Sequence, residues 1–515
     1  MTTTLLGAEQ VPVLRDLFVP ACVRYRDDVA VVCGDRELTY RQIARDADAL
    51  AHALVGAGVG PGVSVAILMS TRPEWVVADQ AVLRCGGVKV PISEMLSASE
   101  IDYILADSGA VVAIVDEAGV GRALAAGRPL TTVIVVGTAA PAGALEWAEV
   151  LARPVPPGPP DVAISPSDLA MIAYTGGTTG RQKGVQHTQH SLSLNLFAHL
   201  IETELGDRER LLLSTPLPHS AGYLLQTGLL KGARNILEPK FDPDRVLDLF
   251  MSADVSLTFM VPTMIYRFLD RAAGRSVDAP RLRTILYGAA PIAVDRLAEG
   301  LRLFGPVFVQ LYGQTEAPNF LTRLSRYDHD PDRPERLASC GRPAVMVEIE
   351  VRDEHDDPLS PGEVGQICAR APYLMSGYRG MPEATADTLA GGWLHTGDIG
   401  RIEDGYVYLL DRSKDMLISG GMNVYTTEVE NVLTRCPEVG QVAVVGVPHP
   451  DWGEAVVAFV VAASEEFDTA PLIERCAEEL ATYKRPKAYR RMEALPVTAF
   501  GKVDKKQLRA KWPGW

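Results

Sequence analysis

The chain alternates short, almost wholly apolar segments with helical patterns, and this alternation constrains the fold more than any other feature. The apolar segments 29–33, 63–68 and 88–92 are rich in valine and isoleucine. Between them, residues 39–58 and 73–87 carry apolar side chains three and four positions apart, as amphipathic helices do. Strands with so few polar positions are typical of parallel sheets that helices cover on both faces. The sequence therefore predicts an α/β fold with doubly covered, mostly parallel sheets.

The same alternation continues through most of the chain. Further apolar segments that we expect to form strands are 110–116, 131–137, 168–175, 210–216, 234–239, 283–288 and 307–313. The proline-rich stretch 154–168 interrupts this series. Because the alternation resumes directly after it, we interpret the stretch as an exposed loop and not as a linker between domains.

The pattern changes near residue 340. Turn-forming residues become frequent there, and the segments 347–353 and 405–411 fit short antiparallel strands. This indicates a small barrel-like subdomain, and after Asp411 the sequence predicts a compact α+β unit. We therefore expect a large N-terminal domain over residues 1–411 and a small C-terminal domain over residues 412–515.

Composition limits the partners of the chain. The formal net charge is -15, which argues against a nucleic-acid-binding protein. The 7 cysteines are scattered singly without a CxxC pair or a Cys/His ligand spacing, which favours neither a zinc motif nor a disulfide framework. The N-terminus does not resemble a signal peptide, and no apolar stretch is long enough for an integral membrane segment. We expect a cytoplasmic protein, and the sequence leaves open a homodimer.

The stretch YTGGTTGRQKGV, residues 174–185, has the composition of a phosphate-binding loop. It fits neither the GxxxxGK[ST] template nor the GxGxxG template. Its glycines allow backbone N–H groups to converge on an anion, its threonines add hydroxyl donors and its lysine adds charge. The residues concerned are Thr175, Gly176, Gly177, Thr178, Thr179 and Lys183. The alternative is a surface turn without a ligand.

This stretch resembles the phosphate loop of the AMP-forming adenylating enzymes, which include the acyl-CoA synthetases, the adenylation domains of peptide synthetases and firefly luciferase. The family commonly has proline before the lysine, where this chain has Gln182, and this suggests a more mobile loop. Four further motifs follow in the family's order: YGAAP (287–291), LYGQTEA (311–317), WLHTGDIG (393–400) and LPVTAFGKVDKKQLR (495–509). The resemblance covers almost the whole chain.

The resemblance implies that ATP and Mg²⁺ bind to these motifs. By the match, Tyr312 stacks on adenine, Thr315 touches the α-phosphate and Glu316 holds Mg²⁺, for which a carboxylate is a suitable ligand. Asp398 binds the ribose hydroxyls, with Arg412 as its companion. The small residues on the adenine side are Gly288, Ala289, Ala290 and Gly313.

The resemblance also implies that the C-terminal domain moves. Lys502 matches the catalytic lysine of adenylation, whose charge would stabilise the transition state at the α-phosphorus. Lys414 matches the hinge about which the small domain rotates before the thiol step. After that rotation the glycine-rich segment 419–423 would face the second half-reaction.

The acid pocket is expected from the same resemblance. His219, in PLPHSAGY (216–223), is a candidate gate at the carboxylate entrance, with a packed structural histidine as the alternative. The pocket is expected to be formed by His219, Tyr223, Met260, Val261, Gly313 and Ala317. No aspartate is placed to meet an α-amino group, so we expect an aryl, alicyclic or medium-chain acid.

The acceptor is less well defined by the sequence. The basic segment 483–491 could contact the phosphates of coenzyme A, or it could be a solvated face. We predict an AMP-forming acid:CoA ligase. A carrier-protein thiol in trans or a nitrogen nucleophile is the alternative acceptor, and a nucleotide-binding protein without catalysis is a further alternative.

Overall fold

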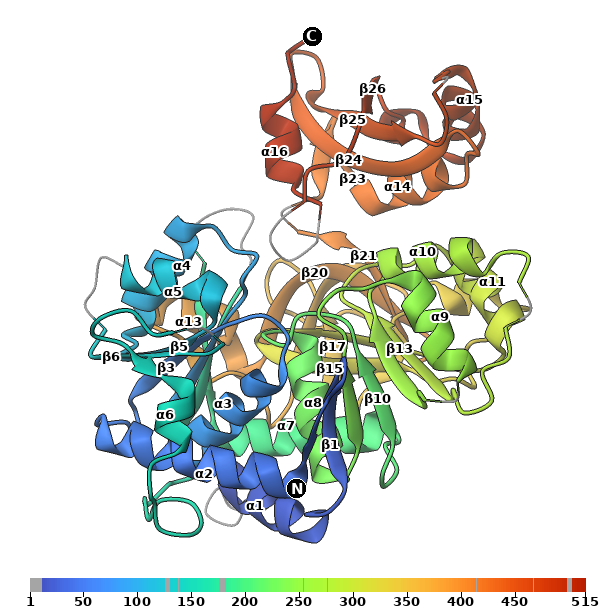
Figure 1. Cartoon of the computed structure of the whole chain (residues 1–515). Coiled ribbons are helices and arrows are strands. Elements are labelled where there is room, and N and C mark those ends of the chain that lie inside the picture. The colour runs from blue at the N-terminus through green and yellow to red at the C-terminus, as the bar shows by residue number, and fades with distance from the viewer. Residues whose placement is uncertain are drawn as a thin grey trace.

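A computed structural model describes residues 12–125, 130–137, 139–175, 182–252, 254–275, 277–413, 415–465, 467–497 and 503–515. In Figure 1 the C-terminal elements, coloured orange to red, form a small unit above a much larger body. The larger body contains two mostly parallel sheets and one antiparallel sheet. Together they give the α/β architecture that the alternation of strands and helices predicts.

The first large sheet has nine strands. Its parallel strands are β14 (Phe308–Gln314), β13 (Thr284–Gly288), β12 (Leu257–Met260), β10 (Arg210–Leu213), β11 (Arg234–Leu237) and β1 (Val29–Cys33). Antiparallel strands complete its two edges: β15 (Ala317–Leu324) and β16 (Arg342–Pro343) beside β14, and β2 (Arg36–Thr39) beside β1.

The second large sheet has eight strands. Its parallel strands are β8 (Leu169–Tyr174), β4 (Val88–Ile92), β3 (Ser64–Leu68), β5 (Val112–Val115), β6 (Thr132–Val135) and β7 (Leu145–Glu146). At one edge, β9 (Gly184–Thr188) runs antiparallel to β8, and the two-residue strand β19 (Gly377–Tyr378) pairs with β9. The predicted phosphate loop is the connection between β8 and β9.

Helices cover both faces of each large sheet, because successive strand residues point to opposite faces. Val65 and Ile67 of β3 belong to the main core between the sheets, whereas Ala66 and Leu68 belong to a second core on the outer face. The helices that contribute to the main core are α1 (Leu14–Arg24), α2 (Tyr40–Gly56), α3 (Pro73–Arg84), α7 (Gln189–Glu202) and α8 (Ser220–Leu230). The helices on outer faces are α4 (Ala98–Ser108), α5 (Glu117–Leu124), α9 (Pro243–Met251), α10 (Pro262–Ala272) and α11 (Val294–Phe304).

The predicted change of pattern near residue 340 is confirmed. A four-stranded antiparallel sheet follows, formed by β17 (Glu348–Arg352), β18 (Gly365–Arg370), β20 (Leu394–Glu403) and β21 (Tyr406–Arg412). The short helices of the larger body are α6 (Trp147–Leu151), α12 (Pro334–Leu337) and α13 (Pro382–Thr388). Residues 154–168 contain no helix or strand, as expected for a loop.

The C-terminal unit has its own sheet and core. Its strands are β22 (Leu417–Ser419), β23 (Met422–Val424), β24 (Val439–His449), β25 (Gly453–Ala462) and β26 (Ala488–Met492). Its helices are α14 (Thr426–Thr434), α15 (Ala470–Glu479) and α16 (Lys505–Ala510). Val444, Val456 and Leu472 are fully buried together in its main core, so the predicted α+β fold of this part is confirmed. Within the described residues, no helix has both the length and the apolar character that crossing a membrane requires.

Candidate functional site

The predicted adenine-side residues lie at the carboxyl ends of strands in the nine-stranded sheet. Strands β12, β13 and β14 are parallel neighbours, with Met260 opposite Tyr287 and Gly288 opposite Leu311. The chain leaves β12 at Val261 and β13 at Ala289, so both segments emerge at the carboxyl end of the sheet. Ligands of open α/β sheets commonly bind at this end.

The adenine-side segment approaches its neighbouring strand so closely that it has room only for glycine. A Cβ atom added to Gly288 would lie 2.3 Å from the carbonyl oxygen of Leu311 on β14. Ala289 then takes a left-handed conformation with φ of 68°, which costs a non-glycine residue about 1 kcal/mol or more. Ala289 and Ala290 are both exposed. Their small side chains leave a flat surface of the kind a nucleobase needs.

Asp398 is the most strongly oriented carboxylate of the site. Its Oδ2 accepts hydrogen bonds from the Tyr312 hydroxyl at 2.6 Å and from Gln314 Nε2 at 2.8 Å. Arg412, opposite Asp398 in the β20–β21 register, places Nε 3.3 Å from Oδ1. Burial and the Asp398 charge raise the pKa of Tyr312 well above its usual range, so the hydroxyl stays protonated and donates. Sequence reasoning missed Gln314.

Glu316 and Lys183 meet through a tyrosine that sequence reasoning also missed. The Tyr378 hydroxyl donates to Glu316 Oε1 at 2.6 Å, and Lys183 Nζ lies 4.4 Å from the centroid of the Tyr378 ring. Tyr378 reaches this position because β19 pairs with β9 just after the phosphate loop. A strand of two residues has no periodicity to detect, and the only signal was an aromatic residue between two glycines.

A buried histidine joins the hairpin of Thr315 to the second sheet. His187 of β9 donates from Nε2 to the Thr315 carbonyl oxygen at 2.8 Å. Burial lowers the pKa of His187 to about 4, so the imidazole is neutral near pH 7. Strand β9, which follows the predicted phosphate loop, is therefore linked to the segment of Thr315 and Glu316 both by His187 and through Tyr378 of the paired strand β19.

The base of the phosphate loop is closed by hydrogen bonds. Thr175 N donates to the carbonyl oxygen of Lys183 at 3.1 Å. Gln182 stands where the family commonly has a proline: its backbone carbonyl oxygen accepts from the Tyr103 hydroxyl at 2.9 Å, and its side-chain Nε2 donates to Glu100 Oε1 at 3.1 Å. These hydrogen bonds to α4 restrict the backbone at the residue where a proline ring would otherwise stiffen it. Gly176, Gly177, Thr178 and Thr179 lie outside the described residues.

The residues predicted to form the acid pocket differ in how deeply they are buried. Met260 and Ala317 are 0% exposed and belong to packed core clusters. Tyr223 and Val261 are only partly buried, and both pack against the main core. The Tyr223 ring stacks on His199 with a centroid separation of 5.8 Å. His219 precedes the first residue of α8 and is also partly exposed.

Lys414 and Lys502 both lie outside the described residues. The strand-like bridge between Val497 and Val503 closes the base of the segment that contains Lys502. Asp504 then caps α16, its side chain accepting from Gln507 N.

The basic segment 483–491 has few free cations. Lys484 is paired with Glu428 at 2.7 Å, and Arg485 donates to two backbone carbonyl oxygens. Lys487 Nζ lies 4.4 Å from the centroid of the Trp452 ring. A Cβ atom on Gly420, in the glycine-rich segment 419–423, would lie 3.0 Å from the same ring. Through their shared contact with Trp452, Lys487 therefore lies beside the glycine-rich turn.

Two oriented carboxylates, Asp398 and Glu316, with the predicted phosphate loop and a separate C-terminal unit, form the arrangement expected of an adenylate-forming enzyme. The comparisons with known proteins agree. Residues 18–379 match the family model of the AMP-binding enzyme, and residues 428–502 match that of the AMP-binding enzyme C-terminal domain. The chain therefore belongs to the AMP-binding enzymes.

Named relatives cover nearly the whole chain. The medium/long-chain-fatty-acid–CoA ligase FadD8 of Mycobacterium tuberculosis is 36% identical over 97% of this chain and 90% of its own length. A feruloyl-CoA synthase of Amycolatopsis is 39% identical over 94% of this chain and 96% of its own length. The solved structure of the amide bond synthetase McbA from Marinactinospora thermotolerans has a TM-score of 0.87 and 32% identity, covering 96% of this chain and 99% of that one. The predictions of the family, the fold and an AMP-forming acid ligase are confirmed.

Proposed function

We propose that the protein activates a carboxylic acid with ATP and transfers the acyl group to the thiol of coenzyme A. In the first half-reaction a carboxylate oxygen attacks the α-phosphorus of ATP, and the bond to pyrophosphate breaks. In the second, the thiol sulfur attacks the acyl carbon and AMP leaves. The observation that carries the proposal is Asp398, which Tyr312, Gln314 and Arg412 orient as a ribose-binding carboxylate.

The residues of the site divide the work of the first step. Asp398 accepts from the vicinal ribose hydroxyls, while the exposed alanines beside Gly288 leave room for the base. Thr175, Lys183 and the glycines of the phosphate loop bind the departing pyrophosphate. Thr315 contacts the α-phosphate, and Lys502 brings positive charge to the reacting phosphorus.

Glu316 is the residue that would hold Mg²⁺. Tyr378 donates to one of its carboxylate oxygens, and no cationic side chain of the described residues pairs with it. A carboxylate oriented by a neutral donor and left without a cation suits a hard divalent ion. When bound, magnesium would neutralise part of the triphosphate charge.

The acid is proposed to be an aryl, alicyclic or medium-chain acid. Tyr223 and Val261 offer an aromatic and an aliphatic surface, and His219 stands at the start of α8 beside them. Relatives named for a fatty acid and for ferulic acid fit this range. Met260 and Ala317 support the pocket from within the core.

Coenzyme A is the preferred acceptor because Lys487 and Trp452 lie beside the glycine-rich turn at Gly420. A nitrogen nucleophile is the second candidate, since an amide bond synthetase shares the fold at 32% identity. The free cysteines, most of them buried, suit the reducing cytoplasm in which we place the protein.

We propose that the domain boundary lies between Asp411 and Arg412 and that Lys414 is the hinge. Two variants test the domain movement together with the function. Lys502→Ala should abolish pyrophosphate release while supplied acyl-adenylate still reacts with coenzyme A. Lys414→Pro should spare adenylate formation and block the thioester, because proline restricts the hinge. Both half-reactions are followed by mass spectrometry of AMP and acyl-CoA. If Lys502→Ala loses both half-reactions equally, or Lys414→Pro loses neither, these roles are wrong.

A further inference from the structure

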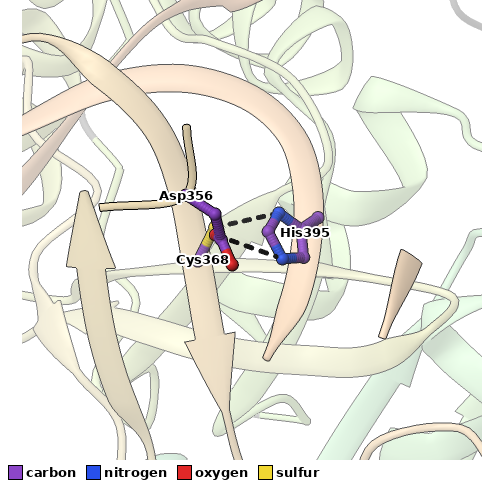
Figure 2. Close-up of side chains that lie close together, drawn as sticks. All are labelled: Asp356, Cys368 and His395. Atoms are coloured by element: carbon purple, nitrogen blue, oxygen red, sulfur yellow. Dashed lines mark hydrogen bonds and ion pairs between the residues drawn. The ribbon is translucent and has the colours of Figure 1, made fainter. Parts of the chain in front are cut away.

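A cysteine, a histidine and an aspartate from three separate segments gather behind the segment that carries Asp398. Cys368 lies on β18, His395 lies on β20 and Asp356 lies in the turn after β17. Their ligating atoms all lie within 4.8 Å of one another (Figure 2). We propose that these three side chains bind a thiophilic divalent cation of the zinc class.

The distances suit such an ion. Cys368 Sγ lies 3.5 Å from His395 Nδ1. In a tetrahedral zinc site, bonds of about 2.3 Å to sulfur and about 2.0 Å to nitrogen place these two atoms about 3.5 Å apart. Asp356 Oδ1 lies 3.6 Å from Nε2, the other nitrogen of the same ring. A shift of the Asp356 carboxylate along the ring edge toward Nδ1 completes three protein ligands, and water supplies the fourth.

Nδ1 of His395, which lies beside both Cys368 and Gln366, is the nitrogen that can bind a metal. Gln366 Oε1 accepts from Gly397 N at 3.0 Å, which fixes the amide so that its Nε2 faces His395 Nδ1 at 3.4 Å. Nδ1 therefore faces a donor and carries the lone pair, while Nε2 carries the proton. Among the described residues, the buried Asp356 Oδ1 makes ion pairs with Arg352 and His395 but accepts no hydrogen bond. Such polar atoms gain from a ligand.

Cys368 and its surroundings allow the exchange of a proton for a metal. Cys368 Sγ lies 3.5 Å from His395 Nδ1, a distance at which its thiol can donate to that nitrogen while no metal is bound. On metal binding the S–H bond breaks, the proton leaves to solvent and a sulfur–metal bond forms. Arg352 lies 3.3 Å from Asp356 Oδ1 and is also paired with Glu350 at 2.8 Å, so it keeps a partner when Asp356 turns to the metal. Asp356, with 41% of its side chain exposed, provides the entry from solvent.

The cluster is connected to the nucleotide site. Gln366 joins His395 to Gly397, and the Thr396 hydroxyl donates to the Ile367 carbonyl oxygen at 2.6 Å. A metal that draws His395 toward Cys368 therefore acts on the residues directly before Asp398.

Cobalt is the probe that tests the site, because a cobalt–thiolate bond gives a charge-transfer absorption that other ligands do not. The purified full-length protein should bind Co²⁺ with this band, and one equivalent of Zn²⁺ should displace it. Cys368→Ser should abolish the band, and Asp356→Asn, at an exposed turn, should weaken binding at least about tenfold. Cys33→Ser removes the one cysteine that is not fully buried and is the matched control, which should keep the band.

The same absorption measurement can overturn the proposal. Absence of the band from the wild-type protein, or its persistence in Cys368→Ser, would show that these side chains do not form the site. Loss of the band in Cys33→Ser would assign the thiolate elsewhere. Since the readout is spectroscopic, it is independent of the proposed ligase activity. Asp356→Asn keeps the test valid if Cys368→Ser fails to fold.

Discussion

Asp398 and Glu316, the two carboxylates of the proposed nucleotide site, are each oriented by a neutral tyrosine hydroxyl. Both carboxylates belong to sequence motifs, so their importance could be predicted from the sequence. Their partners were harder to predict: Tyr378 lies 62 residues from Glu316 and on a strand of only two residues. Tyr312 was predicted to stack on adenine, and its hydroxyl bond to Asp398 depends on the β20 segment folding back over β14. Contacts of this kind are set by tertiary packing and leave no local pattern.

Tyr378→Phe should reduce kcat/KM for ATP in adenylate formation by about 10- to 100-fold. The variant removes a hydrogen bond to a charged group, worth about 1.5–3 kcal/mol, and leaves Glu316 less well oriented. Pyrophosphate release at varied ATP and saturating acid measures the effect. Tyr373→Phe is the control, because the Tyr373 hydroxyl donates to the Phe320 carbonyl oxygen at 2.7 Å, away from the carboxylates. Equal losses in both variants would contradict the role of Tyr378.

At the scale of helices and strands, the predicted elements appear with small differences in their ends. The expected helix 39–58, for example, begins at Tyr40, and Thr39 caps it with Gln42. Apolar strands were predictable because their composition is local. The pairing of β19 with β9 could not be predicted from the sequence, and neither could the contact between α16 and the start of α14. In that contact Lys505 Nζ donates to the Thr426 hydroxyl at 2.7 Å, and Thr426 donates to Asp411.

Lys505→Met should slow adenylation, because this contact fixes the end of the segment that carries Lys502. Lys505 is also paired with Glu430 at 2.8 Å, so its loss leaves a partly buried carboxylate without its cation and lowers the free energy of unfolding by about 1–3 kcal/mol. The double variant Lys505→Met with Glu430→Gln should recover much of the stability, yet still form adenylate slowly. Lys506→Met, on the exposed side of α16, is the control. A double variant with normal adenylation would mean that Lys505 has a purely structural role.

At the scale of the whole molecule, the sheets and helices enclose several neutral histidines. Burial lowers the pKa of His187, His199 and His329 from the usual value of about 6.5 to about 4 in each case. The sequence could not predict that these histidines are buried, because the residue type alone does not indicate whether a side chain is exposed. The sequence does predict the layered architecture that buries these histidines, because the composition of the strands indicates sheets covered on both faces.

The free energy of unfolding should therefore fall as the pH is lowered from about 6.5 to about 4. Over this interval the unfolded chain binds protons that the folded histidines exclude, so the contribution is complete above pH 6.5 and is lost toward pH 4. Each of the three histidines contributes at most about 3 kcal/mol to this loss of unfolding free energy. Calorimetric Tm values at pH 7.5 and pH 5 measure the loss. His329→Gln should lose less stability on acidification than the wild type, whereas His355→Gln, at an exposed turn, should match the wild type. Equal losses in all three proteins would rule out this origin.

We propose that the protein forms an acyl-adenylate and passes the acyl group to coenzyme A. Pyrophosphate release across a panel of aryl, alicyclic and fatty acids, with and without coenzyme A, tests this function while AMP and acyl-CoA are followed by mass spectrometry. We expect one acid class to give pyrophosphate and AMP together with stoichiometric acyl-CoA. Pyrophosphate and bound adenylate without any thioester would contradict coenzyme A as the acceptor and favour a nitrogen nucleophile or a carrier-protein thiol.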